Sequence, residues 1–184
     1  MKKIIIVLVS GCMLLACNSS TSNNQDSVDS AKNVNDSTAS TLRKASDFAT
    51  EAASGGMMEV QLGKLAQEKA QSSRVKEFGA MMVKDHTQAN DELKAIAAKQ
   101  NIVLPDSMSS DKKQHLDDLS KKTGKDFDKA YMDMMVDDHK EDISKFKDAA
   151  QNSPDSAVKA FAANAVPVLQ KHLDSAQAIQ QALK

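Results

Sequence analysis

The sequence predicts an all-α protein organised as a four-helix bundle. Strand-forming residues are scarce, because aromatics make up only 3% of the chain and Trp is missing. Residues that form helices well are common, above all Ala, Lys, Gln and Met. Apolar residues then recur at alternating spacings of three and four in four long segments, which is the pattern of helices that bury one face.

The first sixteen residues are predicted to be a bacterial lipoprotein signal peptide. Lys2 and Lys3 precede a short apolar run at residues 4–15, which is shorter than the ~20 residues of a membrane-spanning helix. The run ends in Leu14-Leu15-Ala16-Cys17, which resembles the lipobox of bacterial lipoproteins. This resemblance implies cleavage before Cys17 and lipid on its thiol. Asn18 follows the Cys where an Asp would otherwise stand, and by resemblance to enteric sorting rules this favours an anchor in the outer membrane, facing the periplasm. Cys12 is lost with the signal peptide, so the mature domain has no disulfide.

Residues 17–45 are predicted to be the lipidated Cys and a disordered polar tether. Nineteen of the 24 residues at 18–41 are Ser, Thr, Asn, Asp or Gln. Such a segment buries too little apolar surface to offset the entropy lost on ordering. The folded domain is therefore expected at residues 46–184.

The first two helices of the domain are expected on either side of Ser72 and Ser73. The first runs from about Asp47 to Ala70, and its inner face carries Ala52, Gly55, Glu59, Leu62 and Ala66. The serines can cap the second helix, whose inner face carries Val75, Gly79, Met82, His86, Ala89, Leu93 and Ile96. It should end near Asn101, ahead of Leu104-Pro105.

A polar connection at residues 106–123 follows, with a short amphipathic helix around Leu116 and Leu119. After Gly124 a third long helix is predicted, with an inner face of Met132, Val136, His139, Ile143, Phe146 and Ala150. Ser153-Pro154-Asp155 then has the pattern of N-cap, first-turn proline and first-turn acid. The fourth helix presents Val158, Phe161, Ala165, Val168, His172, Ala176 and Ile179. Pro167 lies within it and should kink it.

Two of the helices contain a similar nine-residue segment. Phe78–His86 and Tyr131–His139 are identical at five of nine positions, and Phe is replaced by Tyr at the first. The similarity fits either a duplicated helix pair or convergence on one bundle pattern.

Four residues form a candidate metal site. His86, His139 and His172 lie on the inner faces of three different helices, and Glu59 lies on the inner face of the remaining one. Bundle interiors hold metal ions between side chains of facing helices, and this donor set suits zinc, iron or copper. The alternative is that the histidines are hydrogen-bonded core residues and that Glu59 points outward, with Val60 inside. His115 falls in the polar connection and is expected at the surface.

Methionine pairs raise the question of copper. Met82–His86 and Met135–His139 are both spaced i, i+4, so thioether and imidazole share a helix face. Soft thioethers favour Cu(I). Methionine is also an adaptable filler of helical cores, and this second interpretation remains open.

Several functional classes find no support. The chain has 24 basic and 25 acidic residues spread along it, which does not indicate a nucleic-acid-binding protein. It contains no Glu-x-x-His pair of the di-iron type, no HExxH, no GxSxG, no CxxC and no phosphate-binding glycine loop. The sequence therefore favours a protein that is not an enzyme.

Three segments resemble a family of uncharacterised bacterial envelope proteins, often labelled outer-membrane proteins. They are Ser54–Gly63, Val75–His86 with its Met-Val-Lys-Asp-His block, and Phe127–His139 with Met-Val-Asp-Asp-His. The resemblance covers about residues 45–183 and implies a ferritin-like four-helix bundle in the envelope, with no established activity.

Two functions are left open by the sequence. The first is a lipid-anchored envelope domain that binds a protein partner or supports stress tolerance without catalysis. The second is a metal-binding bundle with a metal-handling or redox role, whose ligands are Glu59, His86, His139 and His172. Geometry distinguishes the two functions, because only the metal site requires the ligand atoms of these residues to lie ~2 Å from one common point.

Overall fold

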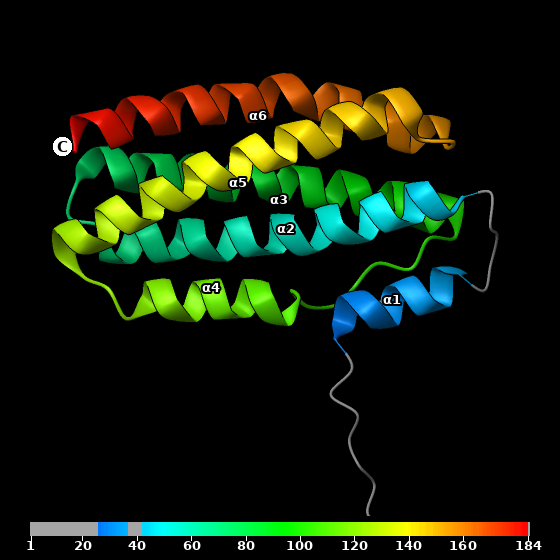
Figure 1. The fold of residues 1–184 in the computed structure, drawn as a ribbon, viewed down its shortest axis with the longest axis horizontal. Coiled ribbons are helices and arrows are strands. Elements are labelled where there is room, and N and C mark those ends of the chain that lie inside the picture. Colours follow the sequence, from blue (N-terminus) through cyan, green and yellow to red (C-terminus); the bar gives the residue numbers. More distant parts are fainter. Residues whose placement is uncertain (1–25, 37–41, 184) are drawn as a thin grey trace, which may run out of the picture.

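The computed structural model describes residues 26–36 and 42–183, and in these ranges the protein is entirely helical, as predicted (Figure 1). The helices are α1 Ser27–Asp36, α2 Arg43–Lys69, α3 Ser73–Gln100, α4 Ser110–Ser120, α5 Gly124–Asn152 and α6 Ser156–Ala182. Residues 1–16, predicted as a signal peptide, and Cys17 lie outside the described residues. Within the described ranges no helix is long and apolar enough to cross a membrane.

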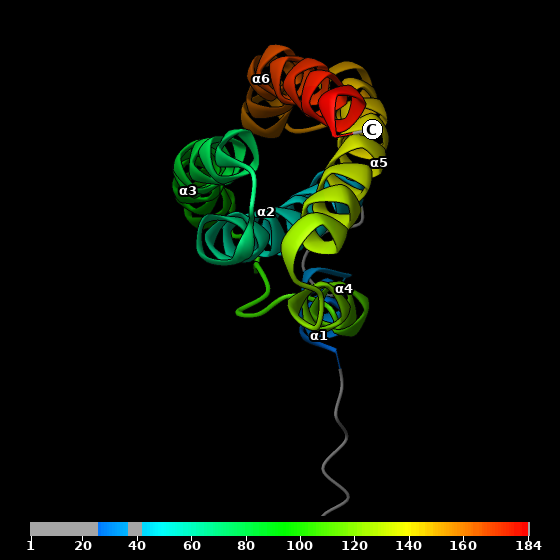
Figure 2. The same ribbon diagram turned by 90° about the vertical axis from the view of Figure 1, so that its left-hand side faces the viewer.

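The four long helices form two hairpins that pack against each other. α2 and α3 make one hairpin and α5 and α6 make the other, and α3 also contacts α6 while α2 contacts α5. The connection at residues 101–123 runs back along the outside and contains α4, which packs on α2 and α5 (Figure 2). As a result α5 starts at the same end as α3, and these two helices run in the same direction (Figure 1).

Residues with a left-handed backbone conformation mark both ends of the connection. α3 ends at Asn101, which has the left-handed φ of 56° and bonds back to the carbonyl of Ala97. α5 starts at Gly124, whose φ is also 56°. Glycine adopts this conformation without the Cβ clash that other residues meet. Both breaks agree with the prediction from sequence.

Two glycines set the spacing within the first hairpin. A Cβ atom built on Gly79 of α3 would lie 2.7 Å from the carbonyl oxygen of Gly63 on α2, and one built on Gly63 would lie 2.6 Å from the oxygen of Gly79. The two backbones therefore touch where these residues cross. The contact lies one turn from Glu59 and two turns from His86 along their helices.

The main hydrophobic core surrounds the middle and one end of the bundle. Leu62, Phe78, Phe127 and Tyr131 are part of it, together with four buried methionines, Met58, Met82, Met132 and Met135. These methionines pack as core residues. A second cluster at the other end contains Ala45, Ala49, Leu93 and Phe161.

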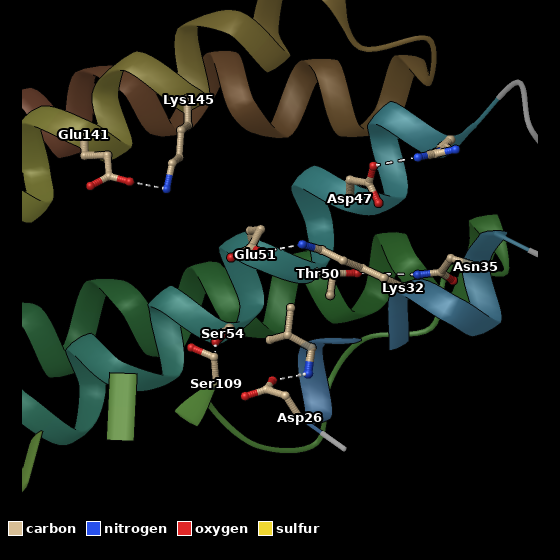
Figure 3. A network of polar contacts seen from close by, with 12 residues as sticks. Asp26, Lys32, Asn35, Asp47, Thr50, Glu51, Ser54, Ser109, Glu141 and Lys145 are labelled. Carbon is tan, nitrogen blue, oxygen red and sulfur yellow. Dashed lines mark hydrogen bonds and ion pairs between the residues drawn. The ribbon is translucent and has the colours of Figure 1, made fainter. Parts of the chain in front are cut away.

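α1 corrects the predicted tether at residues 17–45. Residues 27–36 of that segment form a helix that buries Val28 and Ala31 and packs on α2. The Asn35 side chain both donates to the carbonyl of Val103 at 2.9 Å and accepts from its N–H at 2.8 Å. Lys32 contacts Glu51 of α2 at 2.5 Å (Figure 3). Low overall hydrophobicity suggested disorder, but α1 needs only one narrow apolar face and polar anchors.

Two further boundaries differ from the prediction. The domain begins before residue 46, since α2 starts at Arg43. The N-cap of α6 is Asp155 and not Ser153, because the Asp155 carboxylate accepts the hydrogen bond of the Val158 N–H at 2.8 Å. α6 continues through Pro167 up to Ala182.

Candidate metal centre

The four predicted site residues lie together in the middle of the bundle, one on each long helix. Glu59 comes from α2, His86 from α3, His139 from α5 and His172 from α6, and all four are buried. The three imidazole rings have centroids 5.3–5.9 Å apart. One ring nitrogen of each histidine lies within 4.8 Å of the others.

Hydrogen bonds define which nitrogens of His139 and His172 carry a proton. His139 Nδ1 lies 2.8 Å from the carbonyl oxygen of Met135, which can only accept, so Nδ1 carries the hydrogen. His172 Nε2 lies 3.0 Å from the Asp85 carboxylate and donates to it in the same way. In the neutral rings His139 Nε2 and His172 Nδ1 therefore bear lone pairs, and these two atoms face each other at 3.3 Å.

His86 has the same arrangement. Its Nδ1 lies 2.8 Å from Oε2 of Glu59, to which it donates. Its other nitrogen, Nε2, is buried and has no hydrogen-bond partner among the described residues. His139 and His172 are thus each held by an acceptor at one nitrogen and direct the other nitrogen toward each other, while the acceptor of His86, Glu59, is itself buried in the site. For His139 and His172 this is the outer-shell arrangement that orients histidine ligands of metals.

Glu59 is 1% exposed, so its side chain does not point outward, and the neighbouring Val60 is only half-buried. Its second oxygen, Oε1, has no hydrogen-bond partner in the described part of the chain and lies 3.5 Å from His139 Nε2. The structure therefore brings together the three histidines as one group of potential ligands and places Glu59 beside two of them.

The charges of the site are strongly coupled. Burial would raise the pKa of Glu59, but the charges of His86 and His139 outweigh it and hold this pKa at about 2. Burial would lower the pKa of His86, but the Glu59 carboxylate outweighs it and raises this pKa above its usual value. Burial lowers the pKa of His139, and it lowers that of His172 to about 4 despite the bond to Asp85. Glu59 thus favours the charged form of His86, whereas burial favours the neutral forms of His139 and His172.

The site is surrounded by further ionisable groups, and the sequence did not point to these groups. Burial raises the pKa of Asp138 to about 6 and that of Asp142 to about 7, and the charge of Glu59 adds to both shifts. Asp85 is a further residue of the site that the sequence did not point to. The sequence shows only that Asp85 precedes His86, whereas its hydrogen-bond partner, His172, lies on α6. A residue next to His86 points about 100° away around the helix, which leaves Asp85 free to reach a different helix.

His115 on α4 is exposed, as predicted, and does not belong to the site. Met82 and Met135, the buried methionines four residues before His86 and His139, belong to the hydrophobic core. The carbonyl oxygen of Met135, and not its sulfur, is the group that contacts His139.

Comparisons with known proteins show a family and a fold. Residues 30–179 match the family model described as Domain of unknown function (DUF4142). The solved structures include a DUF305 protein from Streptomyces coelicolor, thought to be secreted, that is similar with a TM-score of 0.60 and 14% identity. The alignment covers 72% of this chain and 89% of that one. A search of curated protein sequences finds no significant match.

Proposed function

We propose that this chain, which belongs to the DUF4142 family, binds a divalent transition-metal ion through His86, His139 and His172. One observation carries the proposal: two buried imidazole nitrogens that both bear lone pairs face each other at 3.3 Å. Without a proton or an ion between them this contact is repulsive. A cation at this point would bind both lone pairs.

The distance fits a tetrahedral ion. Zinc binds histidine nitrogen at about 2.0–2.1 Å, so two such ligands at the tetrahedral angle lie about 3.3 Å apart. His139 Nε2 and His172 Nδ1 have this separation already. His86 would complete the set, because one of its ring nitrogens lies within 4.8 Å of the ligand nitrogens of the other two. Zinc is therefore the first ion to test, and copper and iron are the alternatives that accept imidazole.

Glu59 orients His86 in this proposal, since their hydrogen bond is short and fixes the tautomer of the ring. Its free Oε1 is close enough to the site to serve as an additional ligand. The charges also balance, because the carboxylates of Glu59 and Asp85, bonded to two of the ligands, offset the two positive charges of the ion. A buried ion would otherwise carry a high desolvation cost.

The helix arrangement supports a ferritin-like bundle. Two hairpins joined by one long crossover, with α3 and α5 running in the same direction, are what that fold requires (Figure 1). The ligand set differs from a di-iron centre, because it has three histidines and lacks the Glu-x-x-His pairs. The function we infer is therefore metal binding without ferroxidase chemistry.

We place this function in the bacterial cell envelope, with the chain held by lipid on Cys17 at the outer membrane. The basis is the lipobox-like Leu14-Leu15-Ala16-Cys17 after a short apolar run. Mass spectrometry of the mature N-terminus should find acyl chains on Cys17, and a Cys17→Ser variant should move from the detergent phase to the aqueous phase. An unmodified N-terminus elsewhere in the chain would contradict the anchor.

Metal binding is tested on the purified protein without an affinity tag. Isothermal titration with Zn²⁺ should show one ion per chain, and elemental analysis should find one metal after dialysis. His139→Ala should weaken binding by at least tenfold, because it removes one of three ligands. His115→Ala is the matched control, an exposed histidine outside the site, and should bind normally. Equal binding by both variants, or none by the unmodified protein, would make the buried histidines core residues.

A further inference from the structure

A groove between α3 and α6 opens onto two of the three histidines. It has a volume of about 470 Å³, which is in the range of sites for small molecules. His86 and His172 are among its lining residues, while His139 is fully buried behind them. The groove therefore reaches two of the three proposed ligand residues from the solvent side.

The wall of the groove is largely apolar. Phe146, Phe161 and Leu169 form its inner part, and Ala89 and Ala165 lie on the two flanking helices. Val168, which is 41% exposed, stands at its edge and is one of few large apolar side chains on the described surface. Such a wall favours a flat aromatic or aliphatic body over a sugar or a phosphate.

The metal site would keep one coordination position for an outside ligand. Three histidine ligands leave a tetrahedral ion one ligand short, and this is the arrangement of zinc sites that bind water or substrate. The groove is where the described structure opens toward His86 and His172 together. Glu59, whose Oε1 lies 3.5 Å from His139 Nε2, is the competitor for this position from within the bundle.

Charge selects the donor atom of that ligand. The carboxylates bonded to His86 and His172 already neutralise a divalent ion. The other two charged residues of the groove, Glu92 and Lys171, offset each other. The site with its ion is therefore neutral, so an anionic ligand would leave a net negative charge there, whereas a neutral nitrogen donor would not.

We propose that this groove binds a small molecule that has an apolar, ring-sized body and a neutral nitrogen donor, and that the donor takes the fourth position on the ion. The proposal rests on the proposed metal site. It adds a second ligand of the ion and the chemical class of that ligand.

The test uses the whole protein loaded with Co²⁺, whose visible bands report on coordination. Three probes are titrated: imidazole, 4-phenylimidazole and benzoate. Imidazole and 4-phenylimidazole offer the same donor, so their difference measures the groove. We expect 4-phenylimidazole to bind at least tenfold more tightly than imidazole, and benzoate to bind more weakly than both.

Variants separate the groove from the metal site. Ala165→Trp fills the groove from α6, and it should weaken 4-phenylimidazole at least tenfold and imidazole much less. Ala163→Trp, on the exposed side of the same helix, is the matched control and should behave as the unmodified protein. Val168→Trp at the edge of the groove is a second, better tolerated variant with the same expected direction.

The outcomes distinguish the two proposals. If Co²⁺ shows no bands of a bound ion, the metal site itself is refuted and the groove ligand with it. If Co²⁺ binds but the phenyl group gives no advantage, or if neither groove variant weakens 4-phenylimidazole, the metal site stands and the groove proposal is refuted. Tighter binding of benzoate than of 4-phenylimidazole would refute the choice of a neutral donor.

Discussion

Asp85 bonds to the outer nitrogen of His172 and so connects α3 with a ligand on α6. The carboxylate fixes the tautomer that leaves Nδ1 free for a metal and raises the basicity of the ring. Asp85→Asn should weaken zinc binding about 10–100-fold, the usual effect of losing such a partner. Isothermal titration measures this, with Asp91→Asn on the exposed face of α3 as control. Unchanged affinity in Asp85→Asn would show that Asp85 does not tune the site.

Asp142 makes the stability of the protein depend on pH. Burial, together with the charge of Glu59, raises its pKa to about 7 from 3.8, so the folded state holds this proton more tightly than the unfolded state. Stability from this group is present at low pH and is lost as pH rises from about 4 to about 7. Lys145 and Lys112 oppose the shift, and Asp138 adds to it.

Asp142→Asn should therefore flatten the pH dependence. The neutral amide avoids burial of a charge near Glu59, so we expect the variant to be more stable by about 1–2 kcal/mol at pH 8 and nearly unchanged at pH 5. Urea denaturation at both values, with chelator present, measures the difference. Asp137→Asn, at an exposed position, should leave the free energy of unfolding unchanged at both pH values. A variant destabilised equally at both pH values would contradict this prediction.

At the scale of elements, the crossing of α2 and α3 depends on glycine. In Gly79→Ala the new methyl group would lie 2.7 Å from the Gly63 oxygen and 2.9 Å from the Ala66 Cβ, so the helices must separate. We expect a net loss of about 1–2 kcal/mol, because overpacking exceeds the gain in helix propensity. Gly55→Ala provides the opposite control: its methyl group meets only Lys112 Cε at 3.9 Å. Chemical denaturation should show that Gly55→Ala increases the free energy of unfolding.

Asn35 is one of the polar residues that attach α1 to the rest of the protein. Asn35→Ala leaves both the N–H and the carbonyl of Val103 without this partner, and it also removes the 3.4 Å contact with Thr50 (Figure 3). We expect a loss of about 1–3 kcal/mol and faster hydrogen exchange in residues 27–36. Asn33→Ala, on the exposed face of α1, should leave exchange unchanged. Slow exchange in Asn35→Ala would mean that apolar packing of Val28 and Ala31 suffices.

The similar segments of α3 and α5 have a structural counterpart. Equivalent residues meet: Phe78 lies 6.1 Å from Tyr131 and His86 lies 5.9 Å from His139, between ring centroids. This pairing is possible because the two helices run in the same direction. Tandem duplication of a hairpin would instead relate α2 to α5 and α3 to α6. The similarity between α3 and α5 is therefore not the one that tandem duplication of a hairpin produces.

For the whole molecule, we expect the proposed metal binding to be coupled to folding, because the three candidate ligands come from both hairpins. At a free Zn²⁺ concentration of 100 times the dissociation constant, the folded state should gain about 2.7 kcal/mol. For a domain of this size the thermal midpoint should rise by about 5–10 °C. Calorimetry with and without chelator measures this shift, and His139→Ala should abolish it. A midpoint that does not respond to zinc would contradict the coupling.

The same coupling depends on pH with a defined sign. Glu59 raises the pKa of His86, so at a pH below this raised pKa zinc must displace a proton from the ring of the folded, metal-free protein. Affinity should fall by about tenfold per pH unit below that pKa. The zinc-induced shift of the thermal midpoint should accordingly shrink from pH 8 to pH 5. Titration in two buffers of different ionisation enthalpy would show the proton released on binding.

Much of this protein follows from its sequence alone. Spacing of apolar residues predicts the four long helices, the short helix of the connection and the breaks at Asn101 and Gly124, because burial of one face and backbone conformation are local properties. The same spacing places Glu59, His86, His139 and His172 on inner faces. The tertiary structure decides what these positions do. Helix periodicity gives the side on which a residue lies but not its height relative to other helices, so only packing, including the contact of Gly63 with Gly79, brings the three imidazoles together. It also decides that Asp85 reaches His172, that α1 folds on Asn35, and that a groove opens onto the site, since each depends on residues distant in the chain.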